Sequence, residues 1–288
     1  MLHLIVNPIA GKIKKTDAVR RVTEFLKQEG RKYCITFTEA AGHATKIARE
    51  AVGMGHDIMV LGGDGTLGEA AGGVIGTDRL FYVVPCGTGN DFVKSLRLPS
   101  DPIEALKKQL TGYLRKVDAG MMNDRCFLNV CGTGFDVDTL RYTERFKKRM
   151  TGILPYLLGV IYAFFGFRGR EIQISMGGKS IKKPLTIVAV ANGQYFGGGM
   201  RISPNADVRD GLFDVTYIDD MPKPKMCALL PTVIPGKFLR FACTHVERAK
   251  EVLLECAHMT VNVDGELIDT DRALIRVLSG ALNMRLPV

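Results

Sequence analysis

The chain has 288 residues, a hydrophobic content of 46%, a charged content of 24% and a formal net charge of +9. These values are typical of an ordinary globular protein, exclude a disordered or low-complexity chain, and predict two domains. The positive charge favours an anionic partner, such as a nucleotide, a phospholipid surface or nucleic acid. The seven cysteines include no C-x-x-C pair, so we interpret them as thiols of a protein in a reducing cytosol.

The sequence predicts neither a signal peptide nor a membrane-spanning segment. The apolar start Met1–Val6 has no basic region before it and ends at Asn7 and Pro8. The most apolar stretch, Ile153–Phe167, has 15 residues, which is fewer than the roughly 18 residues of a membrane span. We therefore expect a cytoplasmic protein.

Strands and helices alternate through the first 118 residues of the chain. The expected strands are 2–6, 33–38, 57–61 and 79–84, and the expected helices are 16–29, 44–52 and 67–75. Such alternation predicts a parallel α/β sheet with right-handed crossovers. Ligands of these sheets bind at the carboxyl ends of the strands.

After about Asp118 the pattern changes to strands without regular helices between them. The expected strands are 126–130, 171–176, 185–191, 213–218, 259–263 and 274–278, with a basic and apolar stretch at 139–168. This half predicts a mainly antiparallel, β-sandwich-like domain. We expect a nucleotide-binding domain at 1–118, a β-rich substrate domain at 119–280, and a tail at 281–288 that can return to the first domain. A cleft between two domains is a usual place for a substrate.

A glycine-rich segment, Gly62-Gly63-Asp64-Gly65-Thr66, follows the third expected strand. Its glycines permit positive φ and direct backbone N–H groups at an anion, which predicts a phosphate cradle. The Asp64 carboxylate would repel phosphate unless Mg²⁺ lay between them, and Mg²⁺ prefers one or two carboxylates with phosphate oxygens. The segment therefore indicates nucleoside triphosphate chemistry. A dinucleotide-binding G-x-G-x-x-G loop also matches formally, but it should follow the first strand and hold no acidic residue there.

A second segment of similar composition, Gly87-Thr88-Gly89-Asn90-Asp91-Phe92, follows the next strand. Together the two segments resemble the diacylglycerol kinase catalytic domain of bacterial lipid kinases. The resemblance extends over nearly the whole chain, through Asn7-Pro8-x-Ala10-Gly11-Lys12, Phe127-x-Asn129, Gly134-Phe135-Asp136, Asn192-Gly193, Phe196-Gly197-Gly198-Gly199-Met200, Pro204-x-Ala206, Asp210-Gly211-Leu212-x-Asp214-Val215 and Asp264-Gly265-Glu266.

The resemblance implies transfer of a phosphoryl group from ATP to a lipid alcohol such as diacylglycerol. Nucleotide would bind to the first domain, and lipid would enter between the domains. Asp64 and Asp91 match the acidic residues of the family's Mg²⁺ network. Lys12 can neutralise phosphate charge, although a solvated turn lysine is an equal interpretation. The full set of expected nucleotide-binding residues is Asn7, Lys12, Thr38, Gly62, Gly63, Asp64, Gly65, Thr66, Leu67, Gly68 and Thr88.

Phosphoryl transfer also needs a base for the attacking hydroxyl. Asp264 and Glu266 are candidates, because residues two apart in a strand project from the same face, and Gly265 between them suggests a bend into the cleft. By resemblance one of the pair accepts the proton. We favour Glu266, with Asp264 on the Mg²⁺ network, although an ordinary hairpin turn would also explain the local sequence.

The resemblance further implies a second, structural Mg²⁺ held at positions that match Asp207, Asp210 and Leu212, some of them through backbone carbonyls. Locally, Asp210 followed by glycine is also typical of a simple turn. The chain departs from the family pattern at Gly68, where asparagine is common. A polar contact to the nucleotide or to the other domain would be missing there.

A basic segment, Arg141–Arg149, lies directly before the apolar stretch, and Arg168 and Arg170 follow it. It is either a solvated helix or a surface that attracts the protein to anionic lipid, which would place it at the inner face of the membrane. Nucleic acid is not an expected partner, because the chain lacks tryptophan and a basic-aromatic strand pattern. The oligomeric state is left open, with a homodimer among the options.

The leading hypothesis is therefore an ATP- and Mg²⁺-dependent lipid kinase. An NAD kinase is the first alternative, since it also resembles the chain at G-G-D-G. The Pro85–Phe92 segment and the basic, apolar stretch favour lipid. A non-catalytic lipid- or nucleotide-binding protein of the same fold is the second alternative, for which Gly68 is the only hint.

Overall fold

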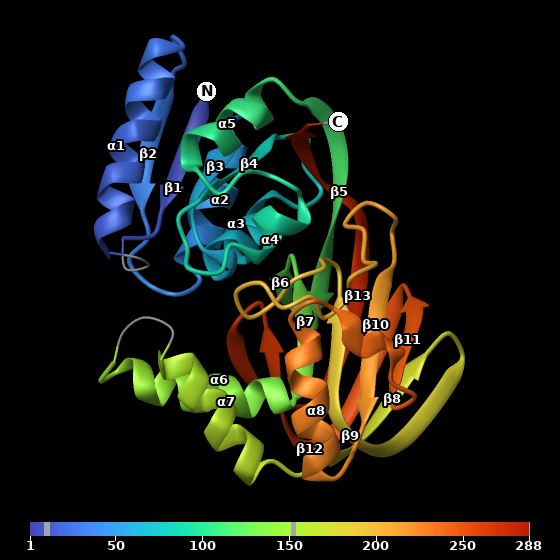
Figure 1. The fold of residues 1–288 in the computed structure, drawn as a ribbon. Coiled ribbons are helices and arrows are strands. Elements are labelled where there is room, and N and C mark those ends of the chain that lie inside the picture. Colours follow the sequence, from blue (N-terminus) through green and yellow to red (C-terminus); the bar gives the residue numbers. More distant parts are fainter. Residues whose placement is uncertain (9–11, 151–153, 288) are drawn as a thin grey trace.

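The structure is a computed structural model that describes residues 1–8, 12–150 and 154–287. Two sheets organise these residues, a four-stranded parallel sheet and a nine-stranded sheet whose pairings are antiparallel (Figure 1). The predicted fold class, an α/β domain followed by an antiparallel β-rich domain, is confirmed. Among the described residues, no helix combines the length and the hydrophobicity needed to cross a bilayer.

The first domain is built on a parallel sheet with the strand order β2, β1, β3, β4, in which β2 is a half-buried edge strand. β1, β3 and β4 are apolar and almost wholly buried, as expected for strands covered on both faces. Side chains of α2 and α3 pack with Ile5 and Val60 on one face, and those of α1 pack with Leu4 and Met59 on the other. The elements are β1 (Leu2–Val6), α1 (Lys12–Gln28), β2 (Tyr33–Phe37), α2 (His43–Gly53), β3 (Asp57–Gly62), α3 (Asp64–Val74), β4 (Phe81–Pro85), α4 (Asp91–Ser95) and α5 (Pro102–Leu110).

Helix α3 begins at Asp64, three residues before the expected start of this helix at residue 67. The acidic side chain lies in the first turn, where it interacts favourably with the helix dipole. A glycine later in the helix allows close packing against α2, because a β-carbon at Gly73 would lie 2.6 Å from the Thr45 carbonyl oxygen. The glycine-rich segment is therefore a direct transition from strand to helix.

The second domain carries one large antiparallel sheet with three α-helices against it in the described residues (Figure 1). The basic and apolar stretch forms helices α6 (Phe135–Lys147) and α7 (Leu154–Gly166). Strands β5 and β11 and helix α8 were not predicted. The remaining elements are β5 (Tyr113–Met122), β6 (Arg125–Phe127), β7 (Val130–Gly134), β8 (Arg170–Met176), β9 (Lys179–Ala191), β10 (Phe213–Asp219), α8 (Lys223–Val233), η1 (Lys237–Arg240), β11 (Thr244–Ala249), β12 (Glu251–Val263) and β13 (Glu266–Leu286).

The chain crosses between the two domains twice, in β5 and in β13. These strands pair along their length, and Figure 1 shows β13 running beside β5 into the first domain. The last residues of β13 contribute Leu282, Met284 and Leu286 to the core that includes α2 and α3. Asp118, where the sequence pattern changes, lies inside β5.

Candidate active site

A cavity of about 610 Å³ is lined by residues of both domains. One end is polar and contains Asp64 and Asp91 from the first domain and Asn129, Asp136 and Asp264 from the second. The other walls are mainly apolar and come from α7, α8 and the strands β9 and β10. A cavity with this division suits a long apolar molecule whose reacting group lies at the polar end.

Asp64 is fixed by hydrogen bonds from both domains. Its Oδ1 accepts from the Phe92 backbone N–H at 3.0 Å, and its Oδ2 accepts from the Asp91 backbone N–H at 3.2 Å. The Asn129 side chain donates to Oδ1 from the second domain at 3.3 Å. Burial, with a further contribution from the nearby Asp91 charge, raises the pKa of the Asp64 carboxyl.

Asp91 is buried and lies beside Asp64. Its Oδ1 pairs with the Lys94 ammonium at 3.0 Å, and its Oδ2 accepts from the Gly198 backbone N–H at 2.7 Å. A β-carbon at Gly89 would lie 3.3 Å from Asp64 Oδ2 and 3.5 Å from Asp91 Oδ2. Glycine at this position therefore keeps a side chain from crowding the two carboxylates.

The donor chemistry of this pair suits a Mg²⁺ ion. An ionised carboxylate has about four lone-pair sites, and the bonds above leave sites free on Asp64 Oδ2 and on both oxygens of Asp91. Two carboxylates with room for phosphate oxygens are the donors that Mg²⁺ prefers in nucleotide sites. Asp64 and Asp91 are thus the residues of this cavity best arranged to hold the ion.

Asp264 has a different environment, because backbone N–H groups surround its carboxylate. Oδ2 accepts from Leu128 at 2.6 Å, Oδ1 accepts from Val130 at 3.0 Å, and the Asn129 N–H lies 3.0 Å from Oδ1 and 3.3 Å from Oδ2. These bonds interrupt the expected strand 126–130, which the structure divides into β6 and β7. Burial, with the Asp64 charge as a smaller cause, raises the pKa of Asp264 to about 7. Asp264 therefore organises the segment that presents Asn129 to Asp64.

Glu266, the favoured base, begins β13 and is exposed. Its Oε2 lies 4.0 Å from the Arg125 guanidinium. Neighbouring Gly265 lines the cavity and has φ of 98°, a conformation that favours glycine and turns the chain at this point. The structure thus places Asp264 in the cavity wall and Glu266 just beyond it.

The two glycine-rich segments pack against each other without side chains between them. A β-carbon at Gly87 would lie 2.6 Å from the Gly63 Cα atom, so this contact requires glycine. Thr88 is exposed directly beyond the contact. The Thr66 hydroxyl accepts from the Asn7 side-chain amide at 3.0 Å, which connects α3 to the end of β1.

The other expected nucleotide-binding positions are near the same edge of the sheet or are not described. Thr38 is buried after β2, where its backbone N–H donates to the Val6 carbonyl at 2.8 Å. Gly68 faces the second domain, and a β-carbon there would lie 3.5 Å from Asp264 Oδ2. Leu67 is fully buried in the core, so its side chain cannot contact a nucleotide. Lys12 begins α1, but its side chain lies outside the described residues.

The positions expected to bind a second Mg²⁺ have other partners in the structure. Asp210 accepts from the Leu212 backbone N–H at 3.0 Å and pairs with Arg248. Asp207 pairs with Arg209, two residues further along the chain, at 3.2 Å. Both carboxylates thus have cationic partners. A second Mg²⁺ at these residues stays a prediction.

Two polar residues of the cavity had no predicted role. Asn129 connects Asp64 to the Ser95 hydroxyl, which lies 3.3 Å from its Oδ1. Asp136 accepts from the Asn262 side chain at 3.1 Å, while its other oxygen is buried without a partner, and burial raises the pKa of Asp136 to about 6. Both residues belong to motifs recognised in the sequence, Phe127-x-Asn129 and Gly134-Phe135-Asp136, but local sequence gave no reason to assign them chemistry.

Each of the two domains matches a known protein family. The diacylglycerol kinase catalytic domain matches residues 1–122, and the YegS C-terminal NAD kinase beta sandwich-like domain matches residues 129–286. The chain belongs to the family defined by the second of these domains, which matches more than half of it, and its first 122 residues match the diacylglycerol kinase catalytic domain. The resemblance found in the sequence is therefore confirmed.

Individual relatives cover nearly the whole chain. A diacylglycerol kinase of Mycobacterium tuberculosis H37Rv is 29% identical over 98% of this chain and 94% of its own. A Pseudomonas aeruginosa PAO1 protein named "Probable lipid kinase YegS-like" is 30% identical over 96% and 92%. The solved structure of a Bacillus anthracis protein assigned as a diacylglycerol kinase is similar with a TM-score of 0.81, at 26% identity over 99% of this chain and 96% of that one.

Proposed function

We propose that the protein is a lipid kinase that transfers the γ-phosphoryl group of ATP to the hydroxyl of diacylglycerol or a related lipid alcohol. The observation that carries this proposal is the cavity, which joins a cluster of carboxylates to a mainly apolar interior. The names of the relatives, diacylglycerol kinase and YegS-like lipid kinase, support the same class of substrate.

The residues divide the proposed reaction between the domains. The backbone N–H groups of the Gly62–Thr66 segment, at the N-terminus of α3, would bind nucleotide phosphates. Asp64 and Asp91 would hold Mg²⁺, which supplies charge neutralisation at the phosphate oxygens when it is bound. The apolar walls would hold the acyl chains, so that the lipid hydroxyl lies at the polar end of the cavity.

We assign the proton transfer to Glu266 and a positioning role to Asp264. The four N–H contacts of Asp264 occupy its lone pairs, whereas Glu266 is exposed and unconstrained by backbone donors in the described structure. A general base contributes about 10² to 10⁴ in rate. Glu266→Gln should therefore lower kcat by about 10²-fold or more and leave the unfolding temperature unchanged, whereas Asp264→Asn should lower both kcat and stability. Full activity of Glu266→Gln would contradict the assignment.

The lipid class can be tested directly with radiolabelled ATP. Diacylglycerol, a sphingoid base and NAD are offered separately to the purified protein with Mg²⁺, and each product is identified by mass. We expect label in a lipid phosphate. Labelled NADP alone would instead establish the NAD kinase alternative, which the description of the second domain's family keeps in view. Absence of all products, with nucleotide still bound, would favour a non-catalytic binder.

A lipid substrate also requires contact with a membrane, and α7 offers a surface for it. Leu154, Leu157, Ile161 and Phe165 recur at helical spacing and are exposed, Phe165 by 77%. Leu157 also lines the cavity, so this face lies beside the entrance to the apolar interior. We propose that α7, with the basic end of α6 before it, binds anionic bilayers at the inner face of the membrane.

Vesicle sedimentation can distinguish membrane binding through α7 from nonspecific hydrophobic binding. Phe165→Ser should reduce binding to vesicles that contain anionic lipid, by about tenfold. Met54→Ser removes a similarly exposed apolar side chain from the first domain and should change nothing. Equal binding by all three proteins, or binding unaffected by anionic lipid or by reversal of the Arg145 and Lys147–Arg149 charges, would rule out the proposed surface.

A further inference from the structure

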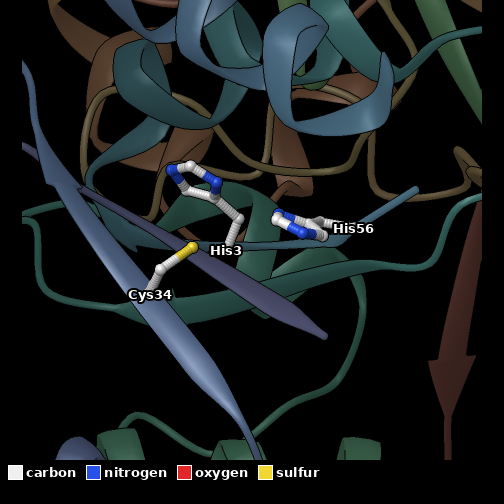
Figure 2. A group of neighbouring side chains, drawn as sticks. All are labelled: His3, Cys34 and His56. Carbon is white, nitrogen blue, oxygen red and sulfur yellow. The ribbon is translucent and has the colours of Figure 1, made fainter. Parts of the chain in front are cut away.

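Three potential metal ligands lie at the edge of the first sheet that is opposite to the cavity. His3 and Cys34 are near the amino ends of β1 and β2, and His56 directly precedes β3. Asp64, in contrast, follows the carboxyl end of β3. Figure 2 shows the two imidazole rings beside the Cys34 sulfur.

The strand register explains why the three side chains meet. His3 is paired with Cys34 on one side and with Ile58 on the other. His56 is two residues before Ile58, and residues two apart in an extended chain project from the same face. Neighbouring strands therefore bring His3, Cys34 and His56 together on one face of the sheet.

The histidines have unused ring nitrogens. His3 is only 7% exposed, and the Nδ1 atoms of both His3 and His56 are buried without a hydrogen-bond partner among the residues that the structure describes. Within the described part of the chain, one ligand atom from each of the three residues lies within 4.8 Å of the others. A buried ring nitrogen without a partner carries a desolvation cost, which a metal ion would remove.

The surroundings keep His3 in the form that binds a metal. Its Nε2 is hydrogen-bonded to the Thr36 hydroxyl at 2.8 Å, which fixes the ring and leaves the Nδ1 lone pair free when Nε2 carries the proton. Burial, together with the nearby His56, lowers the pKa of His3 and favours the neutral ring. Cys34 makes one long contact, 3.9 Å from its sulfur to the Leu2 carbonyl oxygen.

We propose that His3, Cys34 and His56 bind a Zn²⁺ ion, with water as the fourth ligand. Imidazole and thiolate together are ligands that zinc selects, and hard cations such as Mg²⁺ avoid them. Zinc bonds of about 2.0 Å to nitrogen and 2.3 Å to sulfur require ligand atoms roughly 3.5 Å apart, so the side chains would rotate toward one another from their present separation, which is within 4.8 Å. Cys34 and His56 are half-buried, so water can reach the open position. The ion would join β2, β1 and the start of β3.

Cobalt provides a direct test, because a thiolate bound to tetrahedral Co²⁺ gives a charge-transfer band and intense visible bands. The full-length protein, treated with chelator and kept in a non-thiol reductant without Mg²⁺, is titrated with Co²⁺, and Zn²⁺ is then added in competition. We expect one Co²⁺ per chain, displaced by one Zn²⁺. The readout is independent of kinase activity, so its failure would leave the proposed function untouched.

Matched variants identify the ligands. Cys34→Ser should abolish the charge-transfer band, and His56→Gln should weaken Zn²⁺ binding by more than 100-fold. Thr36→Val, which removes only the partner of His3, should weaken binding by about 10- to 100-fold. Cys227→Ser removes an exposed cysteine elsewhere and should bind like the unmodified protein. No band in the unmodified protein, or a band that survives in Cys34→Ser, would overturn the proposal.

Discussion

The two domains contribute to the same cavity in different ways. The first supplies Asp64 and Asp91 from the starts of α3 and α4, the helices that come next in the chain after the buried strands β3 and β4. The second supplies the apolar walls, and its Asp264 holds a loop in place through backbone N–H groups. Short motifs therefore encode the chemistry at the polar end, whereas the shape of the lipid end depends on the packing of elements far apart in the sequence.

Removing the negative charge of Asp64 in the first domain should have the largest effect on activity. In Asp64→Asn the side-chain oxygen can still accept an N–H hydrogen bond, so the fold should persist. The lost carboxylate should lower kcat for lipid phosphorylation about 10³-fold, the scale of one preorganised electrostatic group in an active site. Kinase assays and thermal unfolding measure the two effects. Activity within tenfold of the unmodified protein would show that Asp64 is dispensable, and the division of roles between the domains would fail.

A change in the apolar walls of the cavity should weaken the reaction with lipid but leave nucleotide binding unchanged. Val160 lies on α7, is half-buried and lines the cavity. Val160→Asp should lower kcat/KM for long-chain diacylglycerol about tenfold or more, the scale of one altered apolar contact, while KM for ATP stays constant. Val246→Asp introduces the same charge on β11, away from the cavity, as a control. An equal loss of kcat/KM for diacylglycerol in the Val246→Asp control, or a changed KM for ATP in Val160→Asp, would show that the apolar and polar ends of the cavity do not have separate roles.

The pH dependence of stability should distinguish Asp264 from other carboxyls. The pKa of Asp264 is raised from 3.8 to about 7 in the folded protein. The folded state therefore binds more protons than the unfolded state between these values, and stability falls as the pH rises through this window, by up to about 1 kcal/mol per pH unit. Urea denaturation of Asp264→Asn from pH 4 to 8 should show a shallower fall than the unmodified protein.

Asp136 provides the comparison for this measurement. The pKa of Asp136 is raised to about 6 in the folded protein. The fall in stability with pH that Asp136→Asn removes should therefore be complete about one pH unit below the fall that Asp264→Asn removes. Identical pH profiles for the two variants would mean that neither carboxyl titrates as the structure indicates.

The smallest effect is expected at the contact between the domains. Gly68 lies within α3 and has room for a β-carbon in ordinary contact with Asp264 Oδ2 and the Cys126 carbonyl oxygen, each at 3.5 Å. Gly68→Ala should therefore stabilise the protein by about 1 kcal/mol, the difference in helix propensity, without loss of activity. Denaturation with urea measures the change. Destabilisation would indicate that the domains pack more tightly here than the space suggests.

The fold and the polar end of the site could be predicted largely from sequence, because their signals lie within short stretches of consecutive residues. The buried strands of the first domain are continuous apolar runs, and each glycine-rich segment follows one of them. The break between β6 and β7 could not be predicted, because its cause is Asp264, more than a hundred residues away. Asn129 and Asp136 are likewise placed by contacts that only the folded sheet creates. Their motifs identified the family but not the role of each side chain.

The double crossing through β5 and β13 has a consequence for biosynthesis. Leu282, Met284 and Leu286 contribute to the core of the first domain, although they follow the second domain in the chain. Domains generally fold as units while the chain emerges from the ribosome, N-terminal domain first. Here the core of the first domain stays incomplete until the second domain has been synthesised. Both domains should therefore reach their final state together, and the first domain should not accumulate in folded form without the second.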